Sequence, residues 1–440
     1  MQNPTDIHAA EWEPKIWLIH DPACTCEELT PIKDNLEGLN CQIFAAPFDG
    51  KSLPALPSRQ LVSVVFFFPN DIPDRLLALA EKMRAKLSAV LPALIAVLPA
   101  DISGEYLDQF DSVLRAPAHP SQLATRLSSL LRLHTMTQEL TLRKRTLAAN
   151  YDIAFEVEPV ELPRLHILFV GKPVPEFMAI LHALDDTEAH LTAAFTSFTA
   201  FDFLHTDTFD AVVISGLNGE EPAHTIATTM RRNSRLFNVP ALLLMPEGSK
   251  KLSKSALERG ITDVIAADSD LDEISGRILE LARGQRAHEY ILKSFEALNT
   301  TGATHRPSGI YTEEAFNAHL QRVTIDAARR GRPISVGVVH IRLHPEAKSV
   351  TPEAFAVAKV EVESMIRNVI RVQDFAARLS SNRIGIIFPD TLNDNVDLIM
   401  TRLSELIRAA IFGDADTQFK IELIPNSVTE YEDERRAESA

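Results

Sequence analysis

The sequence is poor in cysteine and has no long apolar run, and each shortage excludes a class of protein. Its 440 residues include only three cysteines, at Cys24, Cys26 and Cys41, whose spacing fits neither a zinc site nor a disulfide framework. The longest apolar stretches, Val62–Pro69 and Leu91–Ala100, are much shorter than the roughly 18–20 residues that cross a membrane. Residues 1–15 are polar and acidic, unlike a signal peptide. We therefore expect reduced thiols, no membrane insertion and a cytoplasmic location.

Positive charge is also scarce, which argues against general binding to nucleic-acid backbones. The chain has 44 Lys and Arg residues against 60 Asp and Glu, a net charge of −16 at pH 7. We expect no direct binding to DNA, because such a chain repels phosphate backbones at long range. A phosphate-bearing ligand would need a local cluster of basic side chains. With 45% hydrophobic residues, the chain is long enough for about three domains with cores of their own.

Two successive segments alternate apolar strands with helices, the pattern of a parallel sheet covered on both faces. In the first segment we expect a long helix after four strands, at Lys15–His20, Leu61–Phe68, Ala93–Leu98 and Ser112–Arg115, the helix covering about Ser121–Ala149. In the second we expect a similar helix after five strands, at His166–Val170, Ala193–Phe195, Ala211–Ser215, Ala241–Met245 and Asp263–Ala266, the helix covering about Leu271–Leu298. Prolines among acidic residues indicate a linker at 151–163, and residues 299–306 read as a flexible joint.

The third segment has a different order, in which a helix is followed by a β-α-β-β-α-β arrangement typical of palm-like folds. We expect helices at Glu313–Arg330, Pro352–Ile370 and Asn395–Phe412. We expect strands at Ile334–Leu343, Phe375–Leu379, Ile384–Phe388 and Phe419–Leu423. The remaining residues, 425–440, form an acidic tail that we expect to be disordered.

A short motif in this third segment carries the strongest functional signal. Arg371 and Asp374 form an R-x-x-D pattern before the predicted hairpin, and Pro389-Asp390-Thr391 follows it. The turn of the hairpin reads Ser380–Ile384. In order and spacing this frame resembles the GGDEF domain of diguanylate cyclases. The family signature Gly-Gly-(Asp/Glu)-Glu-Phe is replaced here by Ser-Ser-Asn-Arg-Ile, so the resemblance implies a degenerate GGDEF domain.

The residues that carry cyclase chemistry in this family are replaced. Diguanylate cyclases hold two Mg²⁺ ions through an aspartate that ends the first strand and an acidic residue in the signature. At the matching positions this chain has His340, and Arg342 two residues later, with Asn382 and Arg383 in the signature. Serines at 380–381 replace the glycines that let the backbone approach phosphates. The final helix of the family, with its basic residues, has no counterpart. We therefore expect no cyclase activity, no metal site and no cofactor.

The same resemblance implies that the R-x-x-D motif binds a nucleotide. In GGDEF proteins this motif binds a mutually intercalated dimer of cyclic di-GMP, often with a second arginine from the next helix. Arg402 has that place here. An arginine fork pairs with guanine O6 and N7 or with phosphate, and an aspartate accepts from guanine N1–H and N2–H₂. We therefore expect Arg371, Asp374 and Arg402 to bind cyclic di-GMP.

Two further roles stay open around this motif. Arg378 is shared with the family, and we expect it to support the hairpin. The alternative for Arg371 and Asp374 is a surface salt bridge without a ligand, worth about 0–1 kcal/mol.

The first two segments resemble receiver domains of response regulators, but their phosphorylation chemistry is missing. The phrases Phe209–Ser215 and Gly260–Asp268 match the third and fifth receiver strands. A working receiver needs an acidic pair, a phosphate-accepting aspartate, a hydroxyl and a lysine at the ends of its strands. In the second segment these positions hold Gly171-Lys172, Ser215 and Ala267. We therefore expect no phosphorylation there.

The first segment has lost the same groups. Only Asp21 remains of the acidic pair, and the region of the acceptor reads Phe66–Asn70. The hydroxyl position falls at Leu98-Pro99 and the lysine position at Ala116. We expect both receiver-like domains to serve in dimerisation and in docking of partners.

The whole layout resembles two-receiver GGDEF response regulators. It implies an α/β chain of two tandem receiver-like, flavodoxin-like domains followed by a degenerate, C-terminally shortened GGDEF palm-like domain. The expected boundaries are 14–150 for the first domain, 151–163 for the linker, 164–298 for the second domain, 299–306 for the joint, 307–424 for the GGDEF-like domain and 425–440 for the tail.

This layout implies a signalling role rather than an enzymatic one. Within the family, the chain most resembles the branch with dead cyclase chemistry and an intact R-x-x-D motif. That branch implies a homodimeric receptor for cyclic di-GMP in cell-cycle control, which moves to a cell pole and recruits protease adaptors or cell-cycle regulators for regulated proteolysis. The alternative is a dimeric scaffold that docks protein partners without any ligand.

Overall fold

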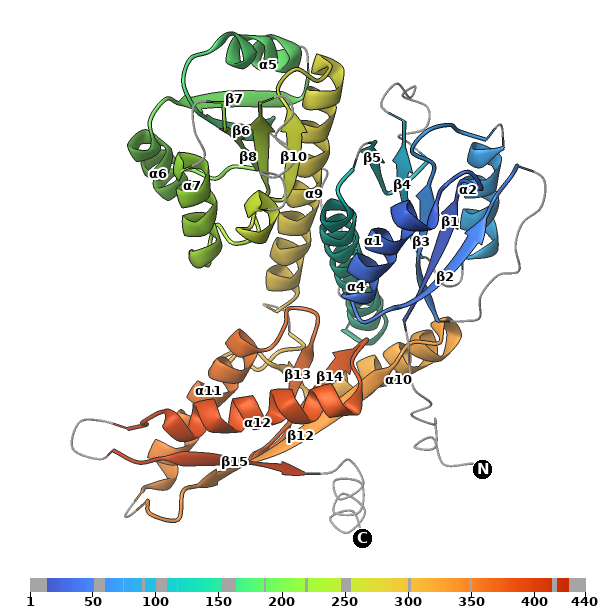
Figure 1. Cartoon of the computed structure of the whole chain (residues 1–440). Helices are drawn as coiled ribbons and strands as arrows, with labels where there is room; N and C mark the ends of the chain where they lie inside the picture. The colour runs from blue at the N-terminus through green and yellow to red at the C-terminus, as the bar shows by residue number, and fades with distance from the viewer. Residues whose placement is uncertain are drawn as a thin grey trace.

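The computed structural model shows three α/β units, each built around its own five-stranded sheet (Figure 1). The structure describes residues 14–50, 60–73, 75–88, 92–99, 109–116, 118–151, 164–185, 187–217, 221–246, 255–299, 302–347, 350–413 and 418–426. The predicted α/β fold class is thereby confirmed. Most of the predicted linker, at 152–163, and the tail from 427 onward lie outside the described residues.

The first unit is a parallel sheet with the strand order of a doubly wound fold. The order β2-β1-β3-β4-β5 is the flavodoxin-like arrangement, and β3 and β4 are buried at every residue, as parallel strands covered on both faces should be. The elements are β1 (Lys15–His20), α1 (Cys26–Glu37), β2 (Gln42–Pro47), β3 (Leu61–Phe67), α2 (Leu76–Lys86), β4 (Ala93–Leu98), β5 (Ser112–Arg115) and α4 (Pro120–Tyr151). A capping box between Thr25 and Glu28 starts α1.

The second unit repeats this plan. Its strand order, β7-β6-β8-β9-β10, is again that of the flavodoxin-like fold. The elements are β6 (Leu165–Val170), α5 (Pro175–Asp185), β7 (Ala189–Ala194), α6 (Ser197–Thr206), β8 (Ala211–Ser215), α7 (Glu221–Arg232), β9 (Ala241–Met245), β10 (Asp263–Ala266) and α9 (Leu271–Leu298). Asp270 caps the start of α9 by accepting from the backbone N–H of Asp272.

The third unit is a mixed sheet of order β11-β13-β14-β12-β15, antiparallel except for the short β11 pair. Its elements are β11 (Tyr311–Thr312), α10 (Glu313–Arg330), β12 (Ile334–Leu343), α11 (Pro352–Val369), β13 (Phe375–Ser380), β14 (Arg383–Pro389), α12 (Asn393–Ala409) and β15 (Ile421–Asn426). Helices α11 and α12 cover one face of the sheet. The other face packs on α10 and on the C-terminal parts of α4 and α9.

Several predicted elements need correction at sheet edges. Strand β2 was not predicted: it is an edge strand with mostly exposed side chains, and its apolar run, Ile43–Ala46, is short. The predicted strand Ala193–Phe195 is wrong in its bounds: β7 begins at Ala189, and polar His190 and Thr192 obscured its first half. Phe195 lies outside the strand and is 47% exposed.

The C-terminal elements also differ from the prediction. Helix α12 ends at Ala409, and Phe412 instead forms an isolated bridge with Phe419. Strand β15 therefore begins at Ile421 and includes Pro425 and Asn426, two residues that were assigned to the tail.

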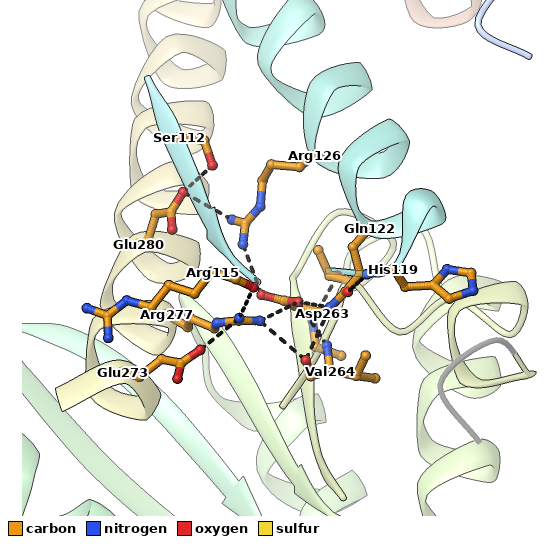
Figure 2. Close-up of polar contacts among 12 residues, drawn as sticks. Ser112, Arg115, His119, Gln122, Arg126, Asp263, Val264, Glu273, Arg277 and Glu280 are labelled. Atoms are coloured by element: carbon orange, nitrogen blue, oxygen red, sulfur yellow. Dashed lines mark hydrogen bonds and ion pairs between the residues drawn. The ribbon is translucent and has the colours of Figure 1, made fainter. Parts of the chain in front are cut away.

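A buried carboxylate joins the first two units (Figure 2). Asp263, at the start of β10, is 1% exposed and accepts from Gln122 Nε2 at 2.6 Å and Arg126 Nη2 at 3.1 Å, both on α4. Arg277 on α9 places Nη1 3.4 Å from the same carboxylate. Burial opposes the charge of Arg126, but Glu280 and Asp263 outweigh it, and the pKa of Arg126 is raised. The contact fixes α4 against the second unit.

The variant Asp263→Ala should destabilise the protein by about 3–5 kcal/mol, because it leaves the buried Arg126 and the half-buried Arg277 without their shared carboxylate. Urea denaturation followed by circular dichroism measures the effect. The control Asp268→Ala removes an exposed carboxylate from the same region and should change the free energy of unfolding by less than about 0.5 kcal/mol. Equal destabilisation by the two variants would contradict the role of Asp263.

Candidate functional site

The R-x-x-D motif forms a tight turn between α11 and β13. The backbone N–H of Asp374 donates to the carbonyl of Arg371 at 2.9 Å. In return, the backbone N–H of Arg371 donates to Oδ2 of Asp374 at 2.9 Å. The aspartate thus closes the turn with its own side chain, as Asp commonly does in turns. The spacing of the motif therefore has a local structural reason.

The carboxylate of Asp374 is buried and only half satisfied. The residue is 5% exposed, and its Oδ1 atom has no hydrogen-bond partner among the described residues. Burial raises the pKa of Asp374 to about 6, against the opposing effects of the Arg371 backbone N–H and the charges of Arg371 and Arg143, while Glu139 adds to the rise. A buried acceptor without a partner costs free energy, so a donor that reached this oxygen would stabilise it.

Arg371 projects from the same turn and is exposed. Within the described residues, its guanidinium makes no hydrogen bond or ion pair, although its charge lowers the pKa of Asp374 from a distance. The side-chain salt bridge that was the alternative for these two residues is not formed. The contact between them runs through the backbone N–H instead.

The structure gives the other two predicted residues different surroundings. Arg402 lies on α12 with an exposed side chain, and no hydrogen bond or ion pair of the described residues links it to Arg371 or Asp374. Arg378, on β13, pairs with Glu363 of α11 through Nε at 2.6 Å and Nη2 at 2.8 Å. Glu363 is 1% exposed. The bidentate pair is therefore largely shielded from water and stabilises the packing of β13 against α11.

A buried network behind the turn was not predicted from the sequence. Arg143 on α4 donates from Nη2 to the carbonyl oxygen of Asp374 at 2.9 Å and from Nε to Glu139 Oε1 at 2.7 Å. His319 on α10 lies 2.8 Å from the same Glu139 oxygen. Arg143, Glu139 and His319 are all at most 2% exposed. The guanidinium also lies over the rings of Phe295 and Phe375, at 4.6 and 5.2 Å.

The turn between β13 and β14 is held by neutral and basic groups. The carbonyl of Asn382 accepts from the N–H of Ile341 at 2.8 Å, and its side chain accepts from Lys359 Nζ at 2.9 Å. In the strand register, His340 stands opposite Arg383. Within the described residues, no group of three or more His, Cys, Asp and Glu side chains could hold a metal ion.

The carboxyl-end edge of the second sheet is closely packed at the point where the strand order reverses. A Cβ atom added to Gly171 would lie 2.5 Å from the Cβ of Ser215. A Cβ on Gly216 would meet the carbonyl oxygen of Leu244 at 2.9 Å. Ligands of open α/β sheets bind in the crevice where the strand order reverses, between β6 and β8 here. These close approaches leave little room at that point.

The first unit retains one acidic side chain at the matching edge. Oδ1 of Asp21 accepts from the backbone N–H of Ala23 at 2.8 Å, so this carboxylate shapes the loop after β1. Phe67 and Phe68, where an acceptor aspartate would follow β3, are both buried.

Comparisons with known proteins find a response regulator and solved structures of GGDEF and receiver domains. No protein-family model matches the chain. The chain is similar to the response regulator PleD of two Caulobacter vibrioides strains, with 20% identity over 206 residues, which is 46% of this chain and 44% of each relative. The chain thus spans less than half of the length of the curated relatives it matches.

Two solved structures are each similar to less than a third of the chain. One is the GGDEF domain of DgcB from Caulobacter crescentus in complex with c-di-GMP, with 19% identity over 28% of this chain and 75% of that one, at a TM-score of 0.26. The other is a signal receiver domain of an HD domain-containing protein from Pseudomonas fluorescens, with 17% identity over 31% of this chain and 98% of that one, at a TM-score of 0.28. In the described part of this chain, no helix is long and apolar enough to cross a membrane.

Beryllofluoride with Mg²⁺ should leave the sedimentation coefficient of the protein unchanged, because both sheet edges lack the acceptor aspartate that this phosphate analogue needs. Analytical ultracentrifugation with and without the analogue measures this. The control Asp21→Asn removes the one retained acidic residue. A shift that occurs in the wild type and disappears in Asp21→Asn would show that the first unit still works as a receiver.

Proposed function

We propose that this chain is a non-enzymatic receptor for cyclic di-GMP that binds its ligand at the turn Arg371–Asp374. One observation carries the proposal. Within the described residues, the exposed Arg371, whose guanidinium makes no hydrogen bond, belongs to the same turn as a buried carboxylate oxygen of Asp374 that has no hydrogen-bond partner. An arginine fork binds guanine O6 and N7 or a phosphate. The orphaned Oδ1 of Asp374 is the acceptor that guanine N1–H and N2–H₂ require.

The ionisation of Asp374 sets the conditions for binding. With a pKa of about 6, the carboxylate is mostly ionised at pH 7 and becomes protonated as the pH falls through 6. A protonated carboxyl accepts poorly from the two donors of a guanine edge. Affinity should therefore be highest above pH 6 and fall below it. Guanine binding also satisfies the buried oxygen and removes part of the cost of its desolvation.

An intercalated dimer of cyclic di-GMP suits this turn better than a single molecule. Stacked guanines with two phosphodiester groups need several arginines, and the turn itself supplies only Arg371. Arg402 is exposed on α12 and makes no hydrogen bond or ion pair with the turn in the part of the chain that the structure describes, so we assign it to a secondary contact. That contact is made with the second nucleotide or across a homodimer.

The hairpin of the third unit supports a receptor and not an enzyme. Two-metal catalysis of phosphodiester formation needs carboxylates, and the matching positions hold His340, Arg342, Asn382 and Arg383. Sequence similarity to a response regulator fits a signalling role. From the resemblance to degenerate GGDEF regulators, we extend the proposal to cell-cycle control at a cell pole, with protease adaptors or cell-cycle regulators as partners.

The rival function is a ligand-independent scaffold. The buried contacts between units favour it, since Asp263 and Arg143 hold the three units in one arrangement without any ligand. Titration with cyclic di-GMP separates the two functions.

The variant Arg371→Ala should weaken binding of cyclic di-GMP by roughly ten- to hundredfold, because it removes charge-assisted hydrogen bonds worth about 1.5–3 kcal/mol. Isothermal titration calorimetry measures affinity and stoichiometry, and about two ligand molecules per site are expected for an intercalated dimer. Arg402→Ala should cost less.

The matched control is Arg408→Ala, which removes another exposed arginine from α12 and should leave affinity unchanged. If Arg371→Ala binds as tightly as the wild type, the receptor function fails. If the wild type itself does not bind, the scaffold function takes its place.

Incubation with GTP and Mg²⁺ or Mn²⁺ should yield no cyclic di-GMP, because no carboxylate remains at the metal positions of the hairpin and the adjoining strand. Chromatography of the nucleotides measures the product. Product that forms with the wild type and is lost in His340→Ala would overturn this expectation.

A further inference from the structure

We propose that Arg143 is the positioning residue of the ligand turn, so that α4 couples the first unit to ligand binding. The inference rests on the proposed function of Arg371–Asp374 and adds its regulation. Arg143 belongs to the helix that ends the first unit, yet its guanidinium reaches the backbone of Asp374 in the third unit. It has no place on the ligand-facing surface, because it is 2% exposed.

The geometry of Arg143 leaves it little freedom. Its Nε is fixed by Glu139 and its Nη2 by the Asp374 carbonyl, while aromatic rings of α9 and β13 pack against the guanidinium plane. The Arg143 guanidinium is planar and is bonded on one side to Glu139 and on the other to the Asp374 carbonyl. A displacement of α4 would therefore also move the Asp374 turn. A lysine could retain the charge but not both contacts.

The residues that continue from the turn are part of the same arrangement. Phe375 directly follows Asp374, and its ring stacks with the rings of Tyr311 and His319, at centroid distances of 4.0 and 4.4 Å. The start of β13 is therefore packed against two rings of the third unit. Glu139 and Thr146 of α4 reach this stack through His319, and Arg143 is the residue of α4 that also bonds the backbone of Asp374.

Charges from every element around Asp374 act on its ionisation. Arg371 on the turn and Arg143 on α4 lower its pKa, whereas burial and Glu139 on α4 raise it. Desolvation opposes ionisation of Glu139, but His319 of α10 and Arg143 outweigh it, and the pKa of Glu139 is lowered. Glu139 thus stays charged beside Asp374. Loss of the Arg143 charge would move protonation of Asp374 to higher pH and remove the ligand acceptor near neutrality.

The N-terminal end of α4 contacts the second unit, so the helix links the second unit to the Asp374 turn. Gln122 and Arg126 hold that end against Asp263 of the second unit. At 1.5 Å per residue, Arg126 and Arg143 lie about 25 Å apart along one continuous helix. A protein partner that shifts α4 at the receiver-like units would withdraw Arg143 from the turn. Conversely, a ligand that orders the turn would favour the docked position of α4.

The test compares the full-length variants Glu139→Gln and Glu139→Gln/Arg143→Met. The Glu139→Gln substitution that both variants share avoids a buried, unpaired carboxylate, so the double variant can fold. Affinity for cyclic di-GMP is titrated from pH 5 to 8, and the ionisation of Asp374 is followed without ligand by carbon-13 NMR of its carboxyl group. Arg145→Ala, which removes an exposed arginine of the same helix, is the control.

The double variant should bind roughly fivefold more weakly than Glu139→Gln at pH 6, with the midpoint of its pH profile about one unit higher, because fewer molecules carry the ionised carboxylate. Glu139→Gln/Arg143→Lys should restore the midpoint but not the full affinity. Identical profiles for Glu139→Gln and the double variant would overturn the inference. If the wild type binds no cyclic di-GMP, the proposed function fails, and the NMR titration alone decides whether Arg143 controls Asp374.

Discussion

Helix α4 carries a buried charge cluster near each end, and the arrangement of the three units depends on both clusters. One cluster joins Gln122 and Arg126 to Asp263 of the second unit. The other joins Glu139 and Arg143 to the third unit. Breaking a buried pair costs about 3–5 kcal/mol, because one charge is left without its partner in a medium of low polarity. The units can therefore separate without this cost only if both charged side chains of each pair become hydrated.

The cluster of Glu139 and Arg143 explains why the Arg371–Asp374 turn is rigid and yet, in the part of the chain that the structure describes, leaves one carboxylate oxygen of Asp374 without a hydrogen bond. The backbone side of the Arg371–Asp374 turn is held by α4, and the carboxylate closes the turn from within. Among the described residues, these contacts use Oδ2 and the carbonyl of Asp374 and leave Oδ1 free. A site whose atoms are fixed before binding loses little conformational entropy when the ligand arrives. In the free protein this fixed geometry costs free energy, because Oδ1 of Asp374 is buried without a hydrogen-bond partner from the described ranges.

The sequence predicted the elements that depend on local pattern and missed the contacts that depend on distant partners. Strands such as β3 and β4 could be found because both of their faces are buried, whereas the edge strand β2 has only a short apolar run and mostly exposed side chains. The spacing of the R-x-x-D motif was readable because the turn is local. Glu139 and Arg143, four residues apart on a helix, look like an ordinary exposed ion pair. Only the packing of α10 and β13 against them makes them buried.

The carboxyl-end edge of the second sheet is closely packed. Gly171 and Ser215 approach each other there, between β6 and β8, where the strand order reverses. Helix α4 contacts all three units, and so does α9. Under the proposed function, ligand binding at Asp374 and partner contacts on the first two units would therefore meet in α4. Such coupling needs only a rigid helix with a buried charge near each end.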